Sequence, residues 1–381
     1  MKEGKTLRMS VTKSTLTCVL GTALLGLVMA PQSAFAQSAD WQKTWADTVA
    51  AAKKEGVIAC GCPVHPGSRA FLLSHWAKDY PDIKLEFTGA KLPEWPARVE
   101  AERAAGQFLW DTMFTGPGPE IYRLAKSGVL DPLLDHIILP DVKDPKTWGG
   151  WDTAFYDKER KRMLSFWQDL TTPFFNAALV SPQEISEKGL NVLLDPKYKG
   201  KIVWWDPRVG GSGSNAAMMV YLKLGEEGLR KLMVDQEPIF VRDATQIAER
   251  LVRGTSAMSL GPSLDEPLAP FVKAGLKFDI RPFGNSDEVA YASTSYAIAS
   301  VLNRPAHPNA AKVFINWLLS RPVQVELAKA AKARSRRVDV PPPAEVTIPI
   351  KPSVNYINVQ REEYLAQRQE VIKLATKFRP Q

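Results

Sequence analysis

The residues best suited to binding a ligand follow a short run of β-branched and aromatic residues at positions 202–205. Arg208 comes next, and a turn rich in glycine and serine, residues 210–214, follows it. Apolar residues then recur with helical spacing over 217–224. This order predicts a strand, a flexible turn and the N-terminus of a helix. Such a terminus presents unpaired N–H groups and partial positive charge, so it could bind an anion, and Arg208 could add a full charge.

The same turn also has a purely structural interpretation, in which Ser212 or Ser214 caps the helix and faces solvent. Capping serines are common, so the turn alone does not decide between the two interpretations. We take the turn and its flanks as the first group of candidate ligand-binding residues. These candidates are Arg208, Gly211, Ser212, Gly213, Ser214 and Asn215.

Two further loops that follow predicted strands carry polar residues. Ser68 and Arg69 stand at an expected helix start, where they could contact a ligand or serve as a cap and a surface cation. Thr115 and Gly116 lie on a loop that we expect at the same edge of the sheet. We therefore add these four residues to the candidates.

The elements that must position these loops alternate between strand and helix over most of the chain. Patterns of this kind predict an α/β protein whose sheets are mostly parallel and flanked by helices. Residues 141–161 are rich in glycine, proline, tryptophan and charge, and we expect them to form a long surface connection. An amphipathic helix is predicted at the end of the chain, over 360–378.

The first 36 residues are expected to be a signal peptide rather than part of the fold. Four basic residues precede an apolar stretch, 16–29. Residues 34–36 then read Ala-Phe-Ala, an A-x-A cleavage signal. The stretch is too short and too close to that signal for a membrane span. A mature periplasmic protein would begin at Gln37. Its formal net charge would fall from +8 to +5, because four basic residues and one acidic residue are removed.

The remaining composition bounds the function. With 45% hydrophobic and 24% charged residues, the 381-residue chain is long enough for two globular domains. No basic face with interleaved aromatic residues occurs, which argues against nucleic acid as a partner. Cys60 and Cys62 lie on a predicted strand. We expect two small buried thiols there rather than a disulfide or a metal site, because strand side chains alternate between faces and only His65 is close.

An exported enzyme would need a nucleophile beside a base, or a cluster of metal ligands. The sequence contains no G-x-S-x-G, no H-E-x-x-H and no Cys/His spacing typical of a metal site. A hydrolase is therefore a weaker hypothesis than a binding protein, and no cofactor is expected. Loss of ester turnover on replacing Ser212 or Ser214 would favour the hydrolase.

Several stretches, in order, resemble those of one protein family: 67–69, 124–133, 198–207 and 310–320. Together with the signal peptide, they are similar to the type II periplasmic binding proteins, the extracellular solute-binding proteins of ABC importers. The closest likeness is to the branch that carries ferric ion, thiamine, polyamines and phosphorylated organic solutes. The resemblance covers roughly residues 40–340.

This resemblance implies two α/β lobes joined by two extended crossovers that act as a hinge. On this chain the crossovers would fall near 166–171 and 289–297. The second lobe would then be 172–288, and the first lobe would be 38–171 together with 289–381. The solute would bind in the cleft between the lobes, which would close around it.

The resemblance also adds candidates to the site. Asp169 lies in the first crossover, where it could accept an amine or hold the hinge. Thr294 lies in the second crossover, where its hydroxyl could reach the ligand or satisfy neighbouring strands. Gly261 and Ser263 lie where the family places a binding loop.

One departure from the family bears on the ligand. Ferric-ion binders of this branch have two adjacent tyrosines just after the strand that here ends at Leu260, but this chain has no Tyr-Tyr pair. Ferric ion prefers anionic oxygen ligands, so a small anionic solute, a carboxylate or a phosphorylated compound, is the favoured hypothesis. The alternatives are a ferric ion or a ferric chelate. The expected protein is a monomer without enzymatic activity that delivers its solute to a membrane permease, although a sensor domain would look the same.

Overall fold

The computed structural model describes residues 32–380 of the chain. The part of the chain from Trp41 onward forms a compact unit, which contains all the described strands. Helix α1 (Gln32–Glu55) begins before this unit. The expected signal peptide lies mainly outside the described residues. Within residues 32–380, no helix combines the length and the apolar character that a membrane span requires.

The first lobe is built on a five-stranded sheet in the order β2-β1-β3-β12-β4. Strand β1 pairs in parallel with β2 and β3, whereas β12 runs antiparallel to β3 and β4. The strands are β1 (Val57–Cys62), β2 (Lys84–Gly89), β3 (Thr112–Thr115), β4 (Leu164–Ser165) and β12 (Ile298–Val301). Its longer helices are α2 (Pro66–Asp79), α3 (Glu94–Ala104), α4 (Pro119–Lys126), α11 (Pro308–Leu319) and α12 (Arg321–Ala331).

The second lobe repeats the plan with a sheet in the order β10-β6-β9-β7-β8. Strand β7 pairs in parallel with β8 and β9, and β6 and β10 complete the sheet in antiparallel pairing. The strands are β6 (Phe174–Asn176), β7 (Ile202–Trp205), β8 (Ile239–Val241), β9 (Met258–Leu260) and β10 (Ile280–Pro282). The helical segments are α7 (Pro182–Lys188), η3 (Gly189–Leu194), η4 (Pro196–Tyr198), α8 (Ser212–Val234), α9 (Ala244–Val252) and α10 (Asp265–Lys273).

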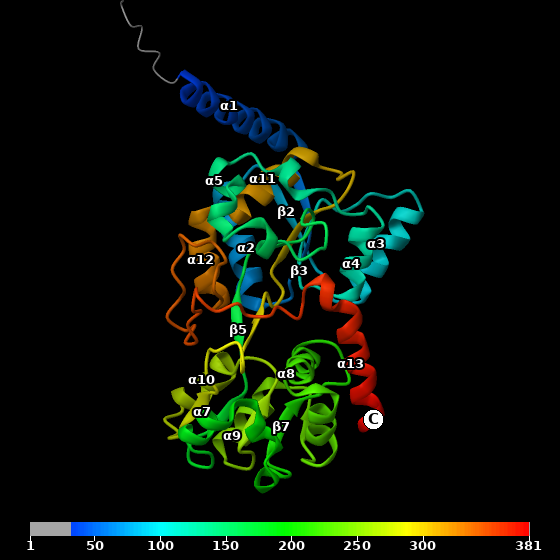
Figure 1. The fold of residues 1–381 in the computed structure, drawn as a ribbon. Coiled ribbons are helices and arrows are strands. Elements are labelled where there is room, and N and C mark those ends of the chain that lie inside the picture. The colour runs from blue at the N-terminus through cyan, green and yellow to red at the C-terminus, as the bar shows by residue number, and fades with distance from the viewer. Residues whose placement is uncertain (1–31, 381) are drawn as a thin grey trace, which may run out of the picture. The chain divides into compact units, whose positions relative to one another are not determined.

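Two short antiparallel strands, β5 (Asp169–Thr171) and β11 (Tyr291–Ser293), join the lobes. In Figure 1, β5 runs between the elements of the first sheet and those of the second. Both strands lie within the segments expected to cross between the lobes, 166–171 and 289–297. Two extended segments can make this connection because they pair with each other and need no core of their own. The prediction of a two-lobed α/β fold is therefore confirmed.

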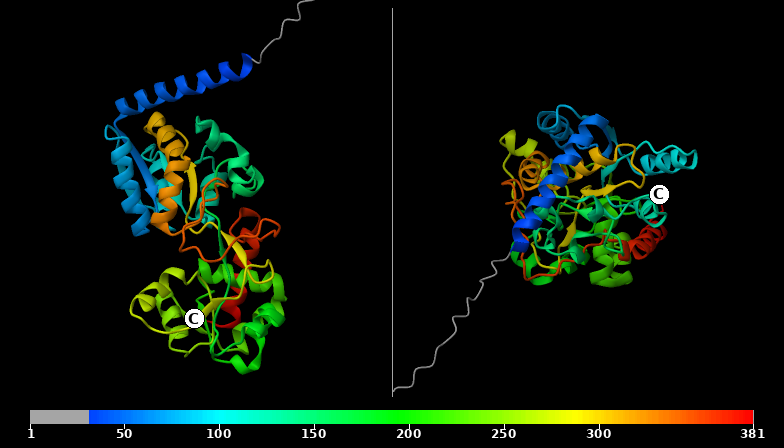
Figure 2. Two further views of the ribbon diagram at one scale, coloured as in Figure 1. Left: turned by 90° about the vertical axis from the view of Figure 1, so that its left-hand side faces the viewer. Right: turned by 90° about the horizontal axis from the view of Figure 1, so that it is seen from above.

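The C-terminal helix differs from expectation. After η5 (Glu362–Tyr364), α13 (Leu365–Phe378) packs along α8 of the second lobe, as Figures 1 and 2 show. Its buried residues Val371 and Ala375 join the core of that lobe. The assignment of the whole of 289–381 to the first lobe is thus wrong for α13. Its apolar face packs on the core of the second lobe, although the residues before it in the chain belong to the first lobe.

The segment expected as a surface connection, 141–161, is instead folded into the first lobe. Trp148, Phe155 and Tyr156 have no exposed surface, and the indole N–H of Trp148 donates to the backbone oxygen of Val142 at 2.9 Å. Burial of its aromatic side chains stabilises packing against the core, and this outweighs the preference of its charged side chains for solvent. The segment and its neighbour form η1 (Leu133–His136), α5 (Pro140–Lys143), η2 (Pro145–Trp148) and α6 (Trp151–Ala154).

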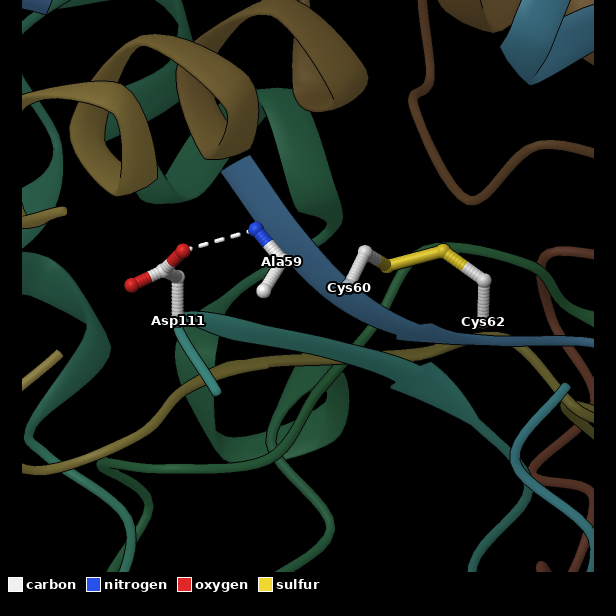
Figure 3. The surroundings of a disulfide bond; sticks show 4 residues. All are labelled: Ala59, Cys60, Cys62 and Asp111. Atoms are coloured by element: carbon white, nitrogen blue, oxygen red, sulfur yellow. Dashed lines mark hydrogen bonds between the residues drawn. A yellow bond between two sulfur atoms is a disulfide. The ribbon is translucent and has the colours of Figure 1, made fainter. Parts of the chain in front are cut away.

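Cys60 and Cys62 form a disulfide, shown in Figure 3, so the expectation of two thiols is wrong. Successive strand residues point to opposite faces, but residues two apart share a face, which brings the two sulfur atoms together. Both cysteines are buried at the end of β1. Nearby, the carboxylate of Asp111 accepts a hydrogen bond from the backbone N–H of Ala59 at 2.7 Å, which holds β1 against the start of β3.

Candidate functional site

Two adjoining cavities lie between the lobes, and the first has a volume of about 850 Å³. Both hinge strands contribute to its wall, through Asp169 and Tyr291 among others. The first lobe supplies His65 from the loop after β1, and the second lobe supplies Ser263 from the loop after β9. Tyr296 adds an aromatic surface, whereas Trp167 borders the cavity without any exposed surface of its own. A ligand in this cavity would therefore contact both lobes and the hinge at once.

The second cavity has a volume of about 660 Å³. It is lined by the loop of Gly116, by the first residues of α4 and α8, and by Arg368 on α13. The two cavities share four residues: Gly211, Asn215, Ser295 and Gln360. The N-terminus of α8 is therefore a common wall between them.

The sequence after β7 explains why α8 begins at this place. A Cβ atom at position 213 would lie 2.1 Å from the backbone oxygen of Trp205, so only glycine lets the helix start this close to the strand. Gly211 is the N-cap residue, with φ of 104°, and no side chain caps the helix. The expected serine cap is thus wrong, and the N–H groups of the first turn lack a side-chain acceptor.

The structure brings half of the candidate residues to the cavities. The residues at the walls are Gly116, Asp169, Gly211, Ser212, Ser214, Asn215 and Ser263. The remaining candidates are in neither wall: Ser68, Arg69, Thr115, Arg208, Gly213, Gly261 and Thr294. Whether any of the wall residues binds a ligand stays a prediction.

Arg208 is used for structure. Its guanidinium forms a two-point ion pair with Asp206, with Nε 2.8 Å from Oδ1 and Nη2 3.0 Å from Oδ2, and its Nη1 donates to the backbone oxygens of Arg379 and Pro380. Burial alone would raise the pKa of the Asp206 carboxyl, but hydrogen bonds from Arg208 and Arg242 lower it below its ordinary value. Arg208 therefore ties the end of the chain to the second lobe and does not face a cavity.

Other candidates support the walls from behind. Ser68 is fully buried within the first turn of α2, whose N-cap is His65, and its Oγ lies 3.3 Å from the hydroxyl of Tyr296, a residue of the first cavity. Thr294 is also fully buried, and its Oγ1 accepts a hydrogen bond from Ser165 and donates to the backbone oxygen of Ala297. Ser68 as a helix cap is thus a further expectation that the structure corrects.

Arg69, Thr115 and Gly261 have other surroundings. Arg69 is exposed and stacks over the ring of Phe87, 5.1 Å from its centre. Thr115 is buried at the end of β3, and Gly261, with φ of 141°, approaches the side chain of Trp205. None of the three has a polar group at a cavity wall.

The first cavity carries more negative than positive side chains. Four carboxylates and two lysines line it: Asp169, Asp265, Glu266, Glu345, Lys273 and Lys332. Burial raises the pKa of Asp169 to about 6, although its Oδ1 accepts a hydrogen bond from the backbone N–H of Arg334 at 2.9 Å. Burial also lowers the pKa of His65, so this imidazole adds little positive charge at neutral pH.

The second cavity contains Arg368, which the sequence analysis did not identify as a candidate. Arg368 is 7% exposed, and its Nη1 donates to the backbone oxygen of Val359 at 3.2 Å and to Oδ1 of Asn215 at 3.5 Å. Burial lowers its pKa, and Tyr122 and Glu120 act in the opposite direction. A signal was present, because Arg368 shares the buried face of α13 with Val371 and Ala375 at helical spacing.

Gln360 connects the two cavities through the hinge. Its Oε1 accepts hydrogen bonds from the hydroxyl of Ser293 at 3.0 Å and from the backbone N–H of Thr294 at 2.8 Å. The hydroxyl of Tyr122 donates to its backbone oxygen. No pattern in the sequence marks this glutamine, since the partners of its side chain lie 66 and 67 residues away.

Among the described residues, no group of three or more histidine, cysteine, aspartate or glutamate side chains is arranged to hold a metal ion. Two tyrosines, Tyr291 and Tyr296, line the first cavity, but burial raises the pKa of both hydroxyls. In the free protein both hydroxyls are therefore neutral at pH 7.

A scan of protein-family models finds no match to the sequence, and a search of curated protein sequences finds none either. Solved structures do match. Iron-bound HitA from Pseudomonas aeruginosa superposes with a TM-score of 0.62 at 15% identity, covering 85% of this chain and 99% of HitA. FutA (IdiA) of Trichodesmium, in complex with iron and citrate, gives 0.62 at 19% identity, with coverages of 86% and 100%.

A third similar structure is the periplasmic binding protein AfuA from Actinobacillus pleuropneumoniae, with fructose-6-phosphate bound. Its TM-score is 0.55 at 18% identity, and the match covers 84% of this chain and 97% of AfuA. At these identities the likeness establishes the fold. The chain has the two-lobed fold of the periplasmic binding proteins.

Proposed function

We propose that this protein, having the fold of the periplasmic binding proteins, is the exported solute-binding receptor of an ABC importer. It captures a small anionic solute between its lobes and delivers it to a membrane permease, acting as a monomer and without chemical conversion. The observation that carries the proposal is the pair of adjoining cavities. Their walls come from both lobes and both hinge strands, so that a bound solute stabilises the closed form.

The disulfide supports export. A bridge between Cys60 and Cys62 persists in an oxidising compartment such as the periplasm and is rare in the cytosol. The A-x-A sequence at residues 34–36 points in the same direction.

The similar structures support an oxyanion as the solute or as part of it. One of them holds a phosphorylated sugar and another holds iron together with citrate. Direct binding of ferric ion is not favoured here, because the pair of adjacent tyrosines is absent from the sequence. A ferric chelate held through its carboxylates remains compatible with the cavities.

A hydrolase is less compatible with the surroundings of the cavity serines. The hydroxyl of Ser214 donates to the backbone oxygen of Gly211 at 3.0 Å, and Nδ1 of His65 accepts a hydrogen bond from the backbone N–H of Ser68 at 3.3 Å. A nucleophile would need a base in contact with it. No such serine–histidine pair involves Ser212 or Ser214 within the described part of the chain.

The experiment is a thermal-shift screen of the purified protein over organic acids, phosphate esters, neutral sugars, amines, ferric ion and ferric citrate. A solute at 100 times its Kd should stabilise the protein by about 2.7 kcal/mol. Small-angle scattering with and without the hit should then show a more compact protein. A screen without any stabilising solute, or a hit that is turned over, would contradict a receptor function. A ferric hit with a tyrosinate absorption band would replace the anion by the metal ion.

A further inference from the structure

Arg368 is a buried charge without an ion-pair partner among residues 32–380. Only 7% of the residue is exposed, yet no carboxylate among residues 32–380 lies within 4.0 Å of its guanidinium. Its Nη1 has two acceptors, whereas Nε and Nη2 have no hydrogen-bond partner in that part of the chain. A buried guanidinium lowers the stability of the fold unless an anion compensates its charge. An anionic ligand bound at this cavity wall would provide that compensation.

Two helix N-termini meet the same cavity, and neither is capped by a side chain. In α8 the first backbone hydrogen bond from the helix start is donated by Asn215 to the oxygen of Gly211, so the N–H groups of Ser212, Gly213 and Ser214 precede it. Helix α4 begins after Gly118, again without a side-chain cap, but its first residue, Pro119, has no N–H. The N–H groups of Ile121 and Tyr122 donate to the backbone oxygen of Gly118, so α4 contributes mainly its dipole. The positive ends of both helix dipoles therefore add to the field of Arg368.

The charges of the two cavities decide which of them suits an anion. The first cavity has four carboxylates against two lysines, whereas the second has Arg368 against the single carboxylate of Glu120. Glu120 lies in the first turn of α4 and has no ion pair with Arg368. The charged side chains of the second cavity therefore balance, whereas those of the first are negative in sum, so an anion is repelled less in the second cavity.

We propose that the second cavity is an oxyanion subsite, in which Arg368 and the N–H groups at the start of α8 bind the phosphate or carboxylate group of the solute, and the dipole of α4 adds positive potential. The inference rests on the proposed function, because it assigns one end of the captured solute. The rest of the solute would extend past Asn215 and Gln360 into the first cavity, which is larger and partly aromatic. Arg368 acts through charge-assisted hydrogen bonds from Nε and Nη2, the atoms left without partners.

The test is isothermal titration of the purified protein with inorganic phosphate, fructose 6-phosphate and citrate, which separates phosphate from carboxylate ligands. Fructose and ethanolamine serve as probes without an oxyanion. Arg368→Gln should weaken binding of the anionic probes about tenfold or more. Arg368→Lys keeps the charge but not the forked set of N–H donors, so its affinity for the anionic probes should lie between that of the wild type and that of Arg368→Gln.

Two further variants control for folding. Arg69→Gln makes the same exchange at an exposed arginine outside both cavities and should leave the Kd unchanged. Glu120→Gln removes the carboxylate that opposes the anion and should tighten binding, by about 2–5-fold. The opposite signs at Arg368 and Glu120 cannot both arise from misfolding.

The outcomes separate the subsite from the proposed function. If Arg368→Gln binds the anionic probes within twofold of the wild type, the subsite is overturned while the receptor function stands. If the wild type binds fructose or ethanolamine but none of the anions, the subsite is again overturned and the receptor function is supported. Absence of all binding overturns the subsite too, and the receptor function is then judged by the wider solute screen.

Discussion

The two cavities between the lobes share one wall but differ in charge. The first is larger, partly aromatic and acidic, and its half-buried Asp169 has a pKa of about 6. The second is smaller and is formed by two helix N-termini and the buried Arg368. Two cavities that adjoin in the same cleft can therefore differ in the charge of the ligand group that they suit. Each cavity keeps an ionisable group that lacks a full complement of partners, and the two groups have opposite sign.

The largest expected effect comes from the wall that both cavities share. Gly213→Ala places a Cβ atom 2.1 Å from the backbone oxygen of Trp205, so α8 must move away from β7. We expect a loss of about 2–3 kcal/mol in unfolding free energy, measured by urea denaturation, together with weaker binding of any solute.

Gly210→Ala is the matched control for this change. A Cβ atom there meets nothing within 4 Å, and stability should stay within about 0.5 kcal/mol of the wild type. Equal effects at the two positions would show that the start of α8 does not depend on the close approach.

The second prediction separates Arg208 from Arg368. Arg208→Gln leaves the buried carboxylate of Asp206 with only Arg242 as an ionic partner, which should cost about 2 kcal/mol of unfolding free energy. Calorimetry should nevertheless find unchanged affinity for an anionic probe, since Arg208 lines neither cavity. Lost affinity in a variant that still folds would restore Arg208 to the site.

The third prediction concerns the pH dependence of the first cavity. The folded protein holds a proton on Asp169 up to about pH 6, above the ordinary value of 3.8, so this carboxyl lowers stability progressively as pH rises from about 4 to 6. Asp169→Asn keeps an acceptor for the N–H of Arg334 and should remove that decline. At pH 7 the variant should be more stable than the wild type, by roughly 2 kcal/mol.

Melting curves of both proteins from pH 4 to pH 7 provide the measurement. The gap between the two Tm values should open as pH rises. A gap that is constant, or one that widens toward low pH, would contradict the raised pKa of Asp169.

The smallest effect is expected at Glu266, an exposed carboxylate of the first cavity with no ion pair among residues 32–380. Glu266→Gln should change the affinity for inorganic phosphate by less than about twofold, because the anion would bind in the other cavity. Titration beside Glu120→Gln compares the two cavities directly. A larger gain at Glu266 would place the anion in the first cavity.

Much of this fold could be predicted from local patterns. The strand 202–205 follows the sequence to the residue, because a continuous run of β-branched and aromatic residues specifies it locally. The segment 141–161 could not be predicted, because its buried aromatic residues meet partners far away in the chain.

The site divides in the same manner. The glycine-serine turn could be placed, since turn chemistry and helix starts are local properties. The choice between Arg208 and Arg368 could not be made, because it depends on where a C-terminal helix docks and on the nearby Asp206, whose carboxylate already engages Arg208. Likewise, Ser68 and Thr294 have suitable hydroxyls, but neighbouring residues already use them.

The docking of α13 has a mechanical consequence. Besides β5 and β11, the chain passes between the lobes a third time, through the residues that lead from α12 to α13. A two-strand hinge can bend freely, but a third tether limits how far the lobes can separate. An open form of this protein should therefore span a narrow angular range, and a single cut in the tether would widen it.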